Sequence, residues 1–240
     1  MVLFGLFLLA VLSGATAAVA GFGIGSLLTP FLAVELGTAA AVAVVAIPHA
    51  AATTLRCWRL RHAVNTTVLR SFGVLSAIGG LAGALLHGFI SARGLTLVLG
   101  LLLLATAVAA LTDWAQHWSP RGPVVGGLGL LSGVFGGLAG NQGGLRAAAL
   151  LSFHLSPVSY VATATATALL VDVARTPVYV WRAAPTLVAY RVPLGVAAVG
   201  VLAGTLVGER VLMGLPPERF RKVIGGAIGL LGVWMLVQGW

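Results

Sequence analysis

Charged residues are scarce in this sequence, and their scarcity excludes a water-soluble fold. Charged residues make up 8% of the 240 residues, whereas hydrophobic residues make up 59%. Soluble globular chains carry about 25% charged residues, which keep their surfaces hydrated. A chain with so few charges cannot cover a soluble domain of this length. We therefore expect most of it to lie within a lipid bilayer.

Cysteine is nearly absent as well, which excludes several kinds of chemistry. Cys57 is the only cysteine, so the chain cannot form an internal disulfide, a CxxC redox pair or a cysteine metal cluster. No group of His, Cys, Asp and Glu has metal-ligand spacing. Ser13 and Ser132 have no convincing histidine base for a serine hydrolase. We therefore expect no enzyme activity, no metal and no cofactor.

The positive charge that is present occurs in short clusters between apolar segments. The net charge is +9, but no single solvated basic patch of the kind that binds nucleic acid is visible. Clusters of this kind contact anionic lipid headgroups and set membrane topology. We expect membrane lipid, and not nucleic acid, as a partner. The two clearest clusters are Arg56, Arg59, Arg61 and Arg219, Arg221, Lys222.

Long uncharged runs predict an all-α polytopic protein of the plasma (inner) membrane, with about eight transmembrane elements. A hydrocarbon core of about 30 Å is crossed by about 20 apolar residues in a helix. The first run resembles a signal peptide ending at Ala18-Val19-Ala20, but no basic residue precedes it, so we expect it to be retained. The predicted elements are 2–34, 38–58, 68–90, 94–112, 122–152, 155–180, 185–209 and 217–238.

The two halves of the chain resemble each other, which predicts an internal repeat. We place the first membrane repeat at 1–112, a linker at 113–121 and the second repeat at 122–240. Glycine, alanine and leucine match often by chance in this composition, so the matched arginines count for more. At an offset of 119 the matches are Ser13-Gly14 with Ser132-Gly133, Ala20-Gly21 with Ala139-Gly140, Gly25 with Gly144 and Arg56 with Arg175; Gly83 matches Gly204 after a shift of two.

The first element of each half is too long for one simple span. A straight helix of 34 residues would be about 51 Å long at 1.5 Å per residue, against a core of about 30 Å. Gly21 to Gly25 and Gly140 to Gly144 are glycine-rich and predict a break, hence a broken or re-entrant helical hairpin in each half. The alternative is that these glycines serve close helix packing.

The hairpins decide the topology of the repeats. If each first element is a hairpin, each half crosses three times and the halves are inverted; if it crosses once, they are parallel. Basic residues favour the cytoplasmic side. With Arg146 set aside, the hairpin arrangement puts nine inside and four outside, and the single span puts eight inside and five outside. Together with the length of the first element, this favours inverted repeats.

The segment Ser132-Gly133-Val134-Phe135-Gly136-Gly137-Leu138-Ala139-Gly140-Asn141-Gln142-Gly143-Gly144 resembles the sulfite exporter TauE/SafE family of membrane permeases. The resemblance covers essentially the whole chain. It implies a secondary transporter, often an exporter, for sulfur-containing anions such as sulfite or organosulfonates. It also implies inverted repeats and a homodimer. The chain departs from the family pattern at Gln142, where glycine is common, and at the first break, which lacks a polar pair.

An anion transported by such a protein needs positive potential within the membrane, and the breaks can supply it. A helix N-terminus carries roughly half a positive charge and free N–H groups. The arms that begin at Gly25 and Gly144 therefore predict an anion site near the midplane, between the two breaks. Arg146 is either a ligand or gate, a salt-bridge partner, or a side chain that reaches the headgroups. The substrate-binding candidates at the breaks are Gly23, Gly25, Asn141, Gln142, Gly143, Gly144 and Arg146.

A second set of candidates lies on two matching helix faces. His49, Thr53 and Arg56 share one face of the second element. In the sixth element Asp172 and Arg175 occupy the matching face, and Thr163 lies on the same helix. We name His49, Thr53, Arg56, Thr163 and Arg175 as substrate-binding candidates, and His49 and Asp172 as proton-coupling candidates.

Structural roles are open for all of this second set. The arginines are near helix ends, where they can snorkel. Asp172 and Arg175 can pair with each other, and threonine hydroxyls can bond to backbone carbonyls one turn back. Taken with the family resemblance, the candidate residues predict a transporter that works by alternating access. An anion channel and a non-transporting membrane subunit stay open as alternatives.

Overall fold

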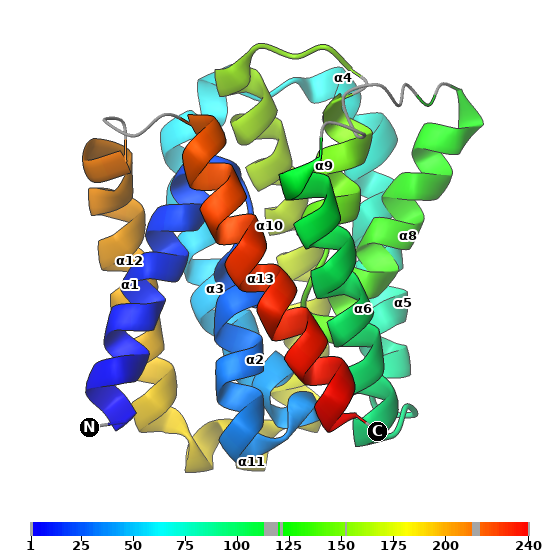
Figure 1. Cartoon of the computed structure of the whole chain (residues 1–240). Helices are drawn as coiled ribbons and strands as arrows, with labels where there is room; N and C mark the ends of the chain where they lie inside the picture. Colours follow the sequence, from blue (N-terminus) through cyan, green and yellow to red (C-terminus); the bar gives the residue numbers. More distant parts are fainter. Residues whose placement is uncertain (1, 113–119, 121, 152, 213–216, 240) are drawn as a thin grey trace.

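The computed structural model describes residues 2–112, 120, 122–151, 153–212 and 217–239, and within these ranges every regular element is helical. The helices form one upright bundle (Figure 1). The predicted all-α fold is therefore confirmed, whereas all of the predicted linker but Pro120 lies outside the described residues. The elements are α1 (Val2–Ala20), α2 (Ile24–Leu36), α3 (Thr38–Leu60), η1 (Arg61–Ala63), α4 (Thr66–Val68), η2 (Leu69–Gly73), α5 (Val74–His87), α6 (Ala92–Leu111), α8 (Pro123–Ala139), α9 (Gly143–Leu151), α10 (Pro157–Arg182), α11 (Ala184–Ala189), α12 (Arg191–Leu212) and α13 (Pro217–Gln238).

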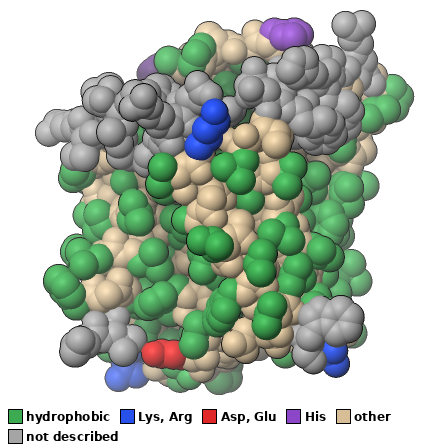
Figure 2. All heavy atoms as spheres, viewed as in Figure 1, with side chains coloured by type: hydrophobic (Ala, Val, Ile, Leu, Met, Phe, Trp, Pro, Cys, Tyr) green, Lys and Arg blue, Asp and Glu red, His purple; other side chains and the backbone are tan. Residues whose placement is uncertain are grey.

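The outer surface of the bundle is apolar and suited to contact lipid. Within the described ranges, six segments are long and apolar enough to cross a membrane, in α1, α3, α4 to α5, α6, α10 and α12, and there are shorter apolar helices in α2, α8 and α13. Large side chains such as Phe4, Leu230 and Val237 are at least two-thirds exposed. On the face shown in Figure 2, hydrophobic side chains cover the middle, and charged ones lie toward the two ends. The chain is therefore a multi-pass membrane protein, as predicted.

Both predicted breaks are present, and each turns the chain back on itself. Between α1 and α2, Gly21 and Gly23 have φ values of 75° and 136°, and Gly140 after α8 has a φ of 71°. These angles favour glycine because it has no Cβ. In Figure 1, α2 returns toward the lower end, where α1 begins, and α9 returns toward the upper end, where α8 begins. The two hairpins thus open at opposite ends of the bundle, as inverted repeats would require.

Each first helix packs on the third element of the other half: α8 lies against α5, and α1 against α12. A methyl group on Gly79 would overlap the carbonyl oxygen of Leu130, and one on Gly204 would overlap that of Val11. Glycine therefore permits the close approach of these backbones. Leu130 and Val11 occupy equivalent positions of the two halves, because they are separated by the offset of 119. Gly204, which contacts Val11, is therefore the structural counterpart of Gly79, which contacts Leu130. The sequence match instead paired Gly204 with Gly83. The inverted duplication itself stays a prediction.

The core that positions the first break lies between α1, α2, α3 and α12. Leu6, Leu28 and Val44 are at most 1% exposed and belong to one cluster with Ile24 and Val201. Because Ile24 is the first residue of α2, this cluster fixes the point at which the chain resumes its helix after the break.

Candidate functional site

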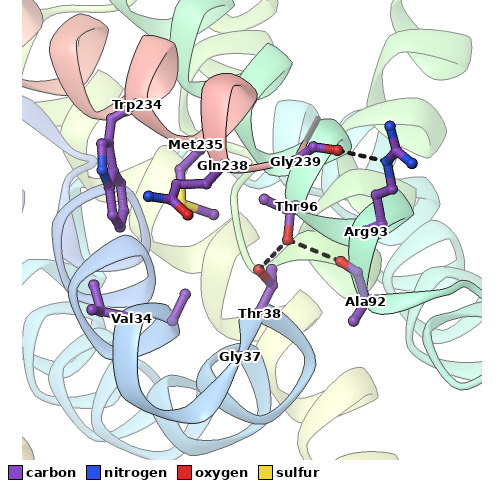
Figure 3. A pocket seen from close by; sticks show the side chains of 11 residues that line it. Val34, Gly37, Thr38, Ala92, Arg93, Thr96, Trp234, Met235, Gln238 and Gly239 are labelled. Atoms are coloured by element: carbon purple, nitrogen blue, oxygen red, sulfur yellow. Dashed lines mark hydrogen bonds between the residues drawn. The ribbon is translucent and has the colours of Figure 1, made fainter.

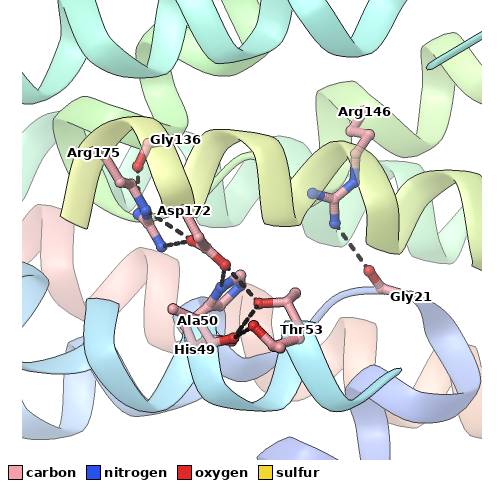
Figure 4. Close-up of polar contacts among 9 residues, drawn as sticks. Gly21, His49, Ala50, Thr53, Gly136, Arg146, Asp172 and Arg175 are labelled. Carbon is pink, nitrogen blue, oxygen red and sulfur yellow. Dashed lines mark hydrogen bonds and ion pairs between the residues drawn. The ribbon is translucent and has the colours of Figure 1, made fainter. Parts of the chain in front are cut away.

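The tips of the two hairpins touch each other inside the bundle. A methyl group on Gly25 would overlap the carbonyl oxygen of Gly140, so the start of α2 lies directly against the end of α8. The Nη2 atom of Arg146 donates a hydrogen bond of 2.9 Å to the carbonyl oxygen of Gly21, as Figure 4 shows. Each break therefore closes against the other across the middle of the fold.

A small cavity of about 20 Å³ lies between the tips. One water molecule needs roughly 10–15 Å³, so the cavity has room for about one, and an anion of several atoms would require the tips to part. Gly144 lines a neighbouring crevice against Thr106 of α6. The cavity is lined by both breaks and by α3, through Phe22, Gly23, Gly25, Ser26, His49, Gly140, Asn141, Gln142, Gly143 and Arg146.

Three polar side chains of the second break line the cavity, and each has one nitrogen or oxygen atom without a hydrogen-bond partner among the described residues. Asn141, Gln142 and Arg146 are 3%, 6% and 3% exposed. Their Nδ2, Oε1 and Nη1 atoms have no hydrogen-bond partner among the residues that the structure describes. A buried polar atom left unpaired costs about 1–3 kcal/mol. Such atoms at one cavity therefore indicate a place where a ligand can complete the hydrogen bonding.

The charge around the cavity is positive. Arg56, Arg146 and Arg175 are at most 3% exposed, and Asp172, at 0%, is the one buried carboxylate among residues whose burial is described. Three arginines against one aspartate leave an excess of two positive charges. The N-termini of α2 and α9 add roughly half a charge each. In a medium that screens weakly, this arrangement is suited to hold an anion.

A hydrogen-bonded network joins α3 to α10 beside the cavity (Figure 4). Asp172 Oδ2 lies 2.7 Å from Nδ1 of His49 and accepts a bond of 2.6 Å from the Thr53 hydroxyl. Its Oδ1 atom pairs with Nη2 of Arg175 at 2.8 Å. The predicted pairing of Asp172 with Arg175 is therefore present, and it extends through His49 to the cavity wall.

Arg56 and Arg175 make matching contacts in the two halves. The Nη1 atom of Arg56 donates to the carbonyl oxygen of Ala17, and that of Arg175 donates to the carbonyl oxygen of Gly136 at 2.6 Å. Ala17 and Gly136 are themselves separated by the offset of 119. Both arginines are buried, so they do not snorkel. Each instead satisfies a carbonyl in the last turn of the helix that precedes the break.

The remaining predicted site residues do not line the cavity. Thr53, Arg56 and Arg175 stand behind the wall, and the hydroxyl of Thr163 accepts a 2.9 Å bond from the backbone N–H of Asn65, away from the cavity. Ser26 and Phe22 line the cavity although the sequence pattern does not single them out. The one available signal was that Ser26 is the first polar residue after the first break.

A larger pocket of about 420 Å³ opens at the lower end of the bundle, where α2, α3, α6 and α13 meet. Figure 3 shows the Thr38 and Thr96 hydroxyls joined across it and Arg93 bound to the carbonyl oxygen of Gly239. It shares no lining residue with the central cavity. Its arginine is exposed and bound to the chain's own backbone, so we do not place the anion site there.

The contact between the tips predicts that Gly25→Ala is damaging. The added methyl group would meet the backbone oxygen of Gly140, and such overpacking costs about 1–3 kcal/mol. We expect a lower thermal midpoint in detergent and a loss of transport. Gly5→Ala is the matched control, since nothing lies within 4 Å of the added methyl group; it should be neutral or stabilise by up to about 1 kcal/mol. Equal midpoints for the two variants would contradict the close contact.

A family model described as "Sulfite exporter TauE/SafE" matches residues 6–235. The match covers nearly the whole chain, including both breaks and the network between α3 and α10. No curated protein and no solved structure matches the chain.

Proposed function

This chain belongs to the sulfite exporter TauE/SafE family, and on that premise we propose that it is a secondary transporter that exports small sulfur-containing anions such as sulfite or organosulfonates. The family is one of membrane transporters, which fits the expectation that the chain is not an enzyme. The plasma membrane location and the homodimer implied by the resemblance stay predictions.

The observation that carries the proposal is the set of unpaired donors in a positively charged cavity. Sulfite and sulfonate oxygens accept hydrogen bonds and carry negative charge. Nδ2 of Asn141 and Nη1 of Arg146 offer donors that have no partner among the described residues, and charge-assisted bonds of this kind are about twice as strong as neutral ones. The N–H groups at the starts of α2 and α9 complete an anion site of the kind that helix N-termini form.

The closed cavity supports a carrier that works by alternating access. The hairpins approach the site from opposite ends of the bundle (Figure 1), and their tips are joined by the contacts of Gly25 with Gly140 and of Arg146 with Gly21. Movement of one hairpin away from the other would open the cavity to one side only.

The proposal predicts that sulfite or a simple sulfonate stabilises the purified protein. A ligand that binds only the folded state adds about 2.7 kcal/mol at 100 times its Kd, which should raise the thermal midpoint by several degrees. Chloride at the same ionic strength is the control. In proteoliposomes, radiolabelled sulfite should then move at a rate that saturates with concentration.

The same measurements separate the alternatives. Sulfite current that rises linearly with voltage and does not saturate would indicate an anion channel. If no sulfur anion shifts the thermal midpoint and none is transported, the chain is a non-transporting subunit and the proposal would be abandoned.

A further inference from the structure

A titratable side chain, His49, forms part of the cavity wall. Its side chain is 12% exposed, and Nδ1 faces the carboxylate of Asp172 at 2.7 Å. The other ring nitrogen, Nε2, has no hydrogen-bond partner among the described residues. A carboxylate that accepts from Nδ1–H fixes the histidine tautomer that leaves Nε2 free to accept a proton.

We propose that His49 binds a proton that is carried across the membrane together with the anion. The inference rests on the proposed function and adds the coupling ion to it. In each cycle Nε2 takes one proton from water on the side where the cavity is open, and releases it to water on the other side when the anion leaves. Asp172 acts as a positioning residue, because it holds the ring at 2.7 Å and is itself fully buried and absent from the cavity lining.

The charges around His49 explain why proton and anion should bind together. Asp172 favours the protonated ring, but Asp172 is shared with Arg175 of α10. Arg56 on α3 and Arg146 on α9 oppose a further positive charge. The helices α1, α2 and α8 bring no titratable group to this place, since their one charged residue is Glu35 at the far end of α2.

An anion in the cavity reverses this balance. It offsets the arginines, so the ring binds a proton more strongly when the anion is present. By thermodynamic reciprocity the protonated ring raises the affinity for the anion by the same factor. Two ligands that favour each other's binding occupy the carrier together, which makes the proton a cotransported ion.

The position of this network suits a proton site that both sides of the membrane can reach. Thr53 and Asp172 are separated by the same offset of 119 as the matched arginines, and they touch each other at 2.6 Å. If the halves are related by a two-fold axis, equivalent positions can touch each other only close to that axis. The network therefore lies near the axis between the two halves, where His49 can face whichever side the cavity opens to.

The test compares the wild type with His49→Gln in proteoliposomes. Glutamine can still donate to Asp172, but it does not titrate. Radiolabelled methanesulfonate exchange is measured with the same pH on both sides, and net accumulation is measured with the outside one pH unit more acidic and the voltage clamped. The wild type should accumulate methanesulfonate up to about tenfold, the ratio one proton supplies per pH unit. His49→Gln should keep exchange and lose the accumulation.

His87→Gln is the matched control, because His87 ends the apolar helix α5 and its Nδ1 atom donates a hydrogen bond of 2.7 Å to the carbonyl oxygen of Leu138, outside the cavity. It should keep both activities. Methanesulfonate is the probe because bisulfite carried without any proton site on the protein would also accumulate on the alkaline side. Gradient-driven accumulation of methanesulfonate by His49→Gln at the wild-type level would overturn the inference. Absence of exchange of both methanesulfonate and sulfite in the wild type would instead count against the proposed function.

A second measurement needs no variant. Methanesulfonate, whose sulfonate stays ionised at neutral pH, is mixed with weakly buffered wild-type protein and a pH indicator. We expect proton uptake that approaches one per bound anion and saturates with binding. Binding without proton uptake would overturn the inference even if His49→Gln fails to fold. Failure of both methanesulfonate and sulfite to bind would contradict the proposed function.

Discussion

Replacing Arg146 with glutamine should lower kcat/KM for sulfite by about 30-fold or more. Nη1 of this buried arginine has no partner among the described residues, and Nη2 reaches the opposite break at Gly21. Removing one partner of a buried charged contact costs about 2–5 kcal/mol, and every 1.4 kcal/mol is tenfold. The loss should appear in both transport and the sulfite-dependent thermal shift.

Two further variants make this prediction specific. Arg146→Lys keeps the charge but loses the fork of donors, so it should fall between the wild type and Arg146→Gln. Arg61→Gln removes an exposed arginine that lies over the Trp58 ring at 5.1 Å, and should leave transport within about twofold. A folded Arg146→Gln protein that transports sulfite at the wild-type rate would exclude Arg146 as a ligand.

Asp172→Asn should destabilise the protein by about 3–5 kcal/mol, the usual cost of removing one partner of a buried ion pair. Asp172 is fully buried and is held by Arg175, His49 and Thr53 together. Asparagine fills the same space, but it leaves the Arg175 guanidinium without its counter-charge. Chemical denaturation in detergent micelles measures the loss.

A double variant separates charge from packing. Asp172→Asn combined with Arg175→Gln removes both charges, so it should recover much of the lost stability, although not transport. Glu35→Gln, at an exposed carboxylate near the end of α2, should stay within about 0.5 kcal/mol of the wild type. If Asp172→Asn were as stable as Glu35→Gln, the ion pair would have no structural role.

Local pattern and length were sufficient to predict the helices and the breaks. The first run is too long for one span and contains Gly21 and Gly23, so a break there follows from helix geometry and glycine propensity alone. The second break is marked by the polar pair Asn141 and Gln142, which lipid would not accommodate. Helix starts at Ile24 and Gly143 lie one residue before the expected arms, within the uncertainty that fraying gives such boundaries.

Contacts between distant segments could not be predicted in this way. The pairing of Asp172 with Arg175 follows from helical spacing, but the contact of Asp172 with His49 joins residues 123 apart in the sequence, which periodicity does not encode. For the same reason Thr163 could not be recognised as an acceptor for the backbone of Asn65. Whether a polar residue lines the cavity or supports its wall depends on how α3 and α10 cross.

The exchange of first helices between the halves bears on how such a chain could arise. Because α1 lies against α12 and α8 against α5, a chain with one half alone would leave the small-residue face of its first helix bare. A second copy inserted upside down in the same membrane would cover that face and receive the same cover in return. If the halves are inverted repeats, as we predict, the glycine contacts at Gly79 and Gly204 are those that an ancestral antiparallel pair of half-length proteins would have needed.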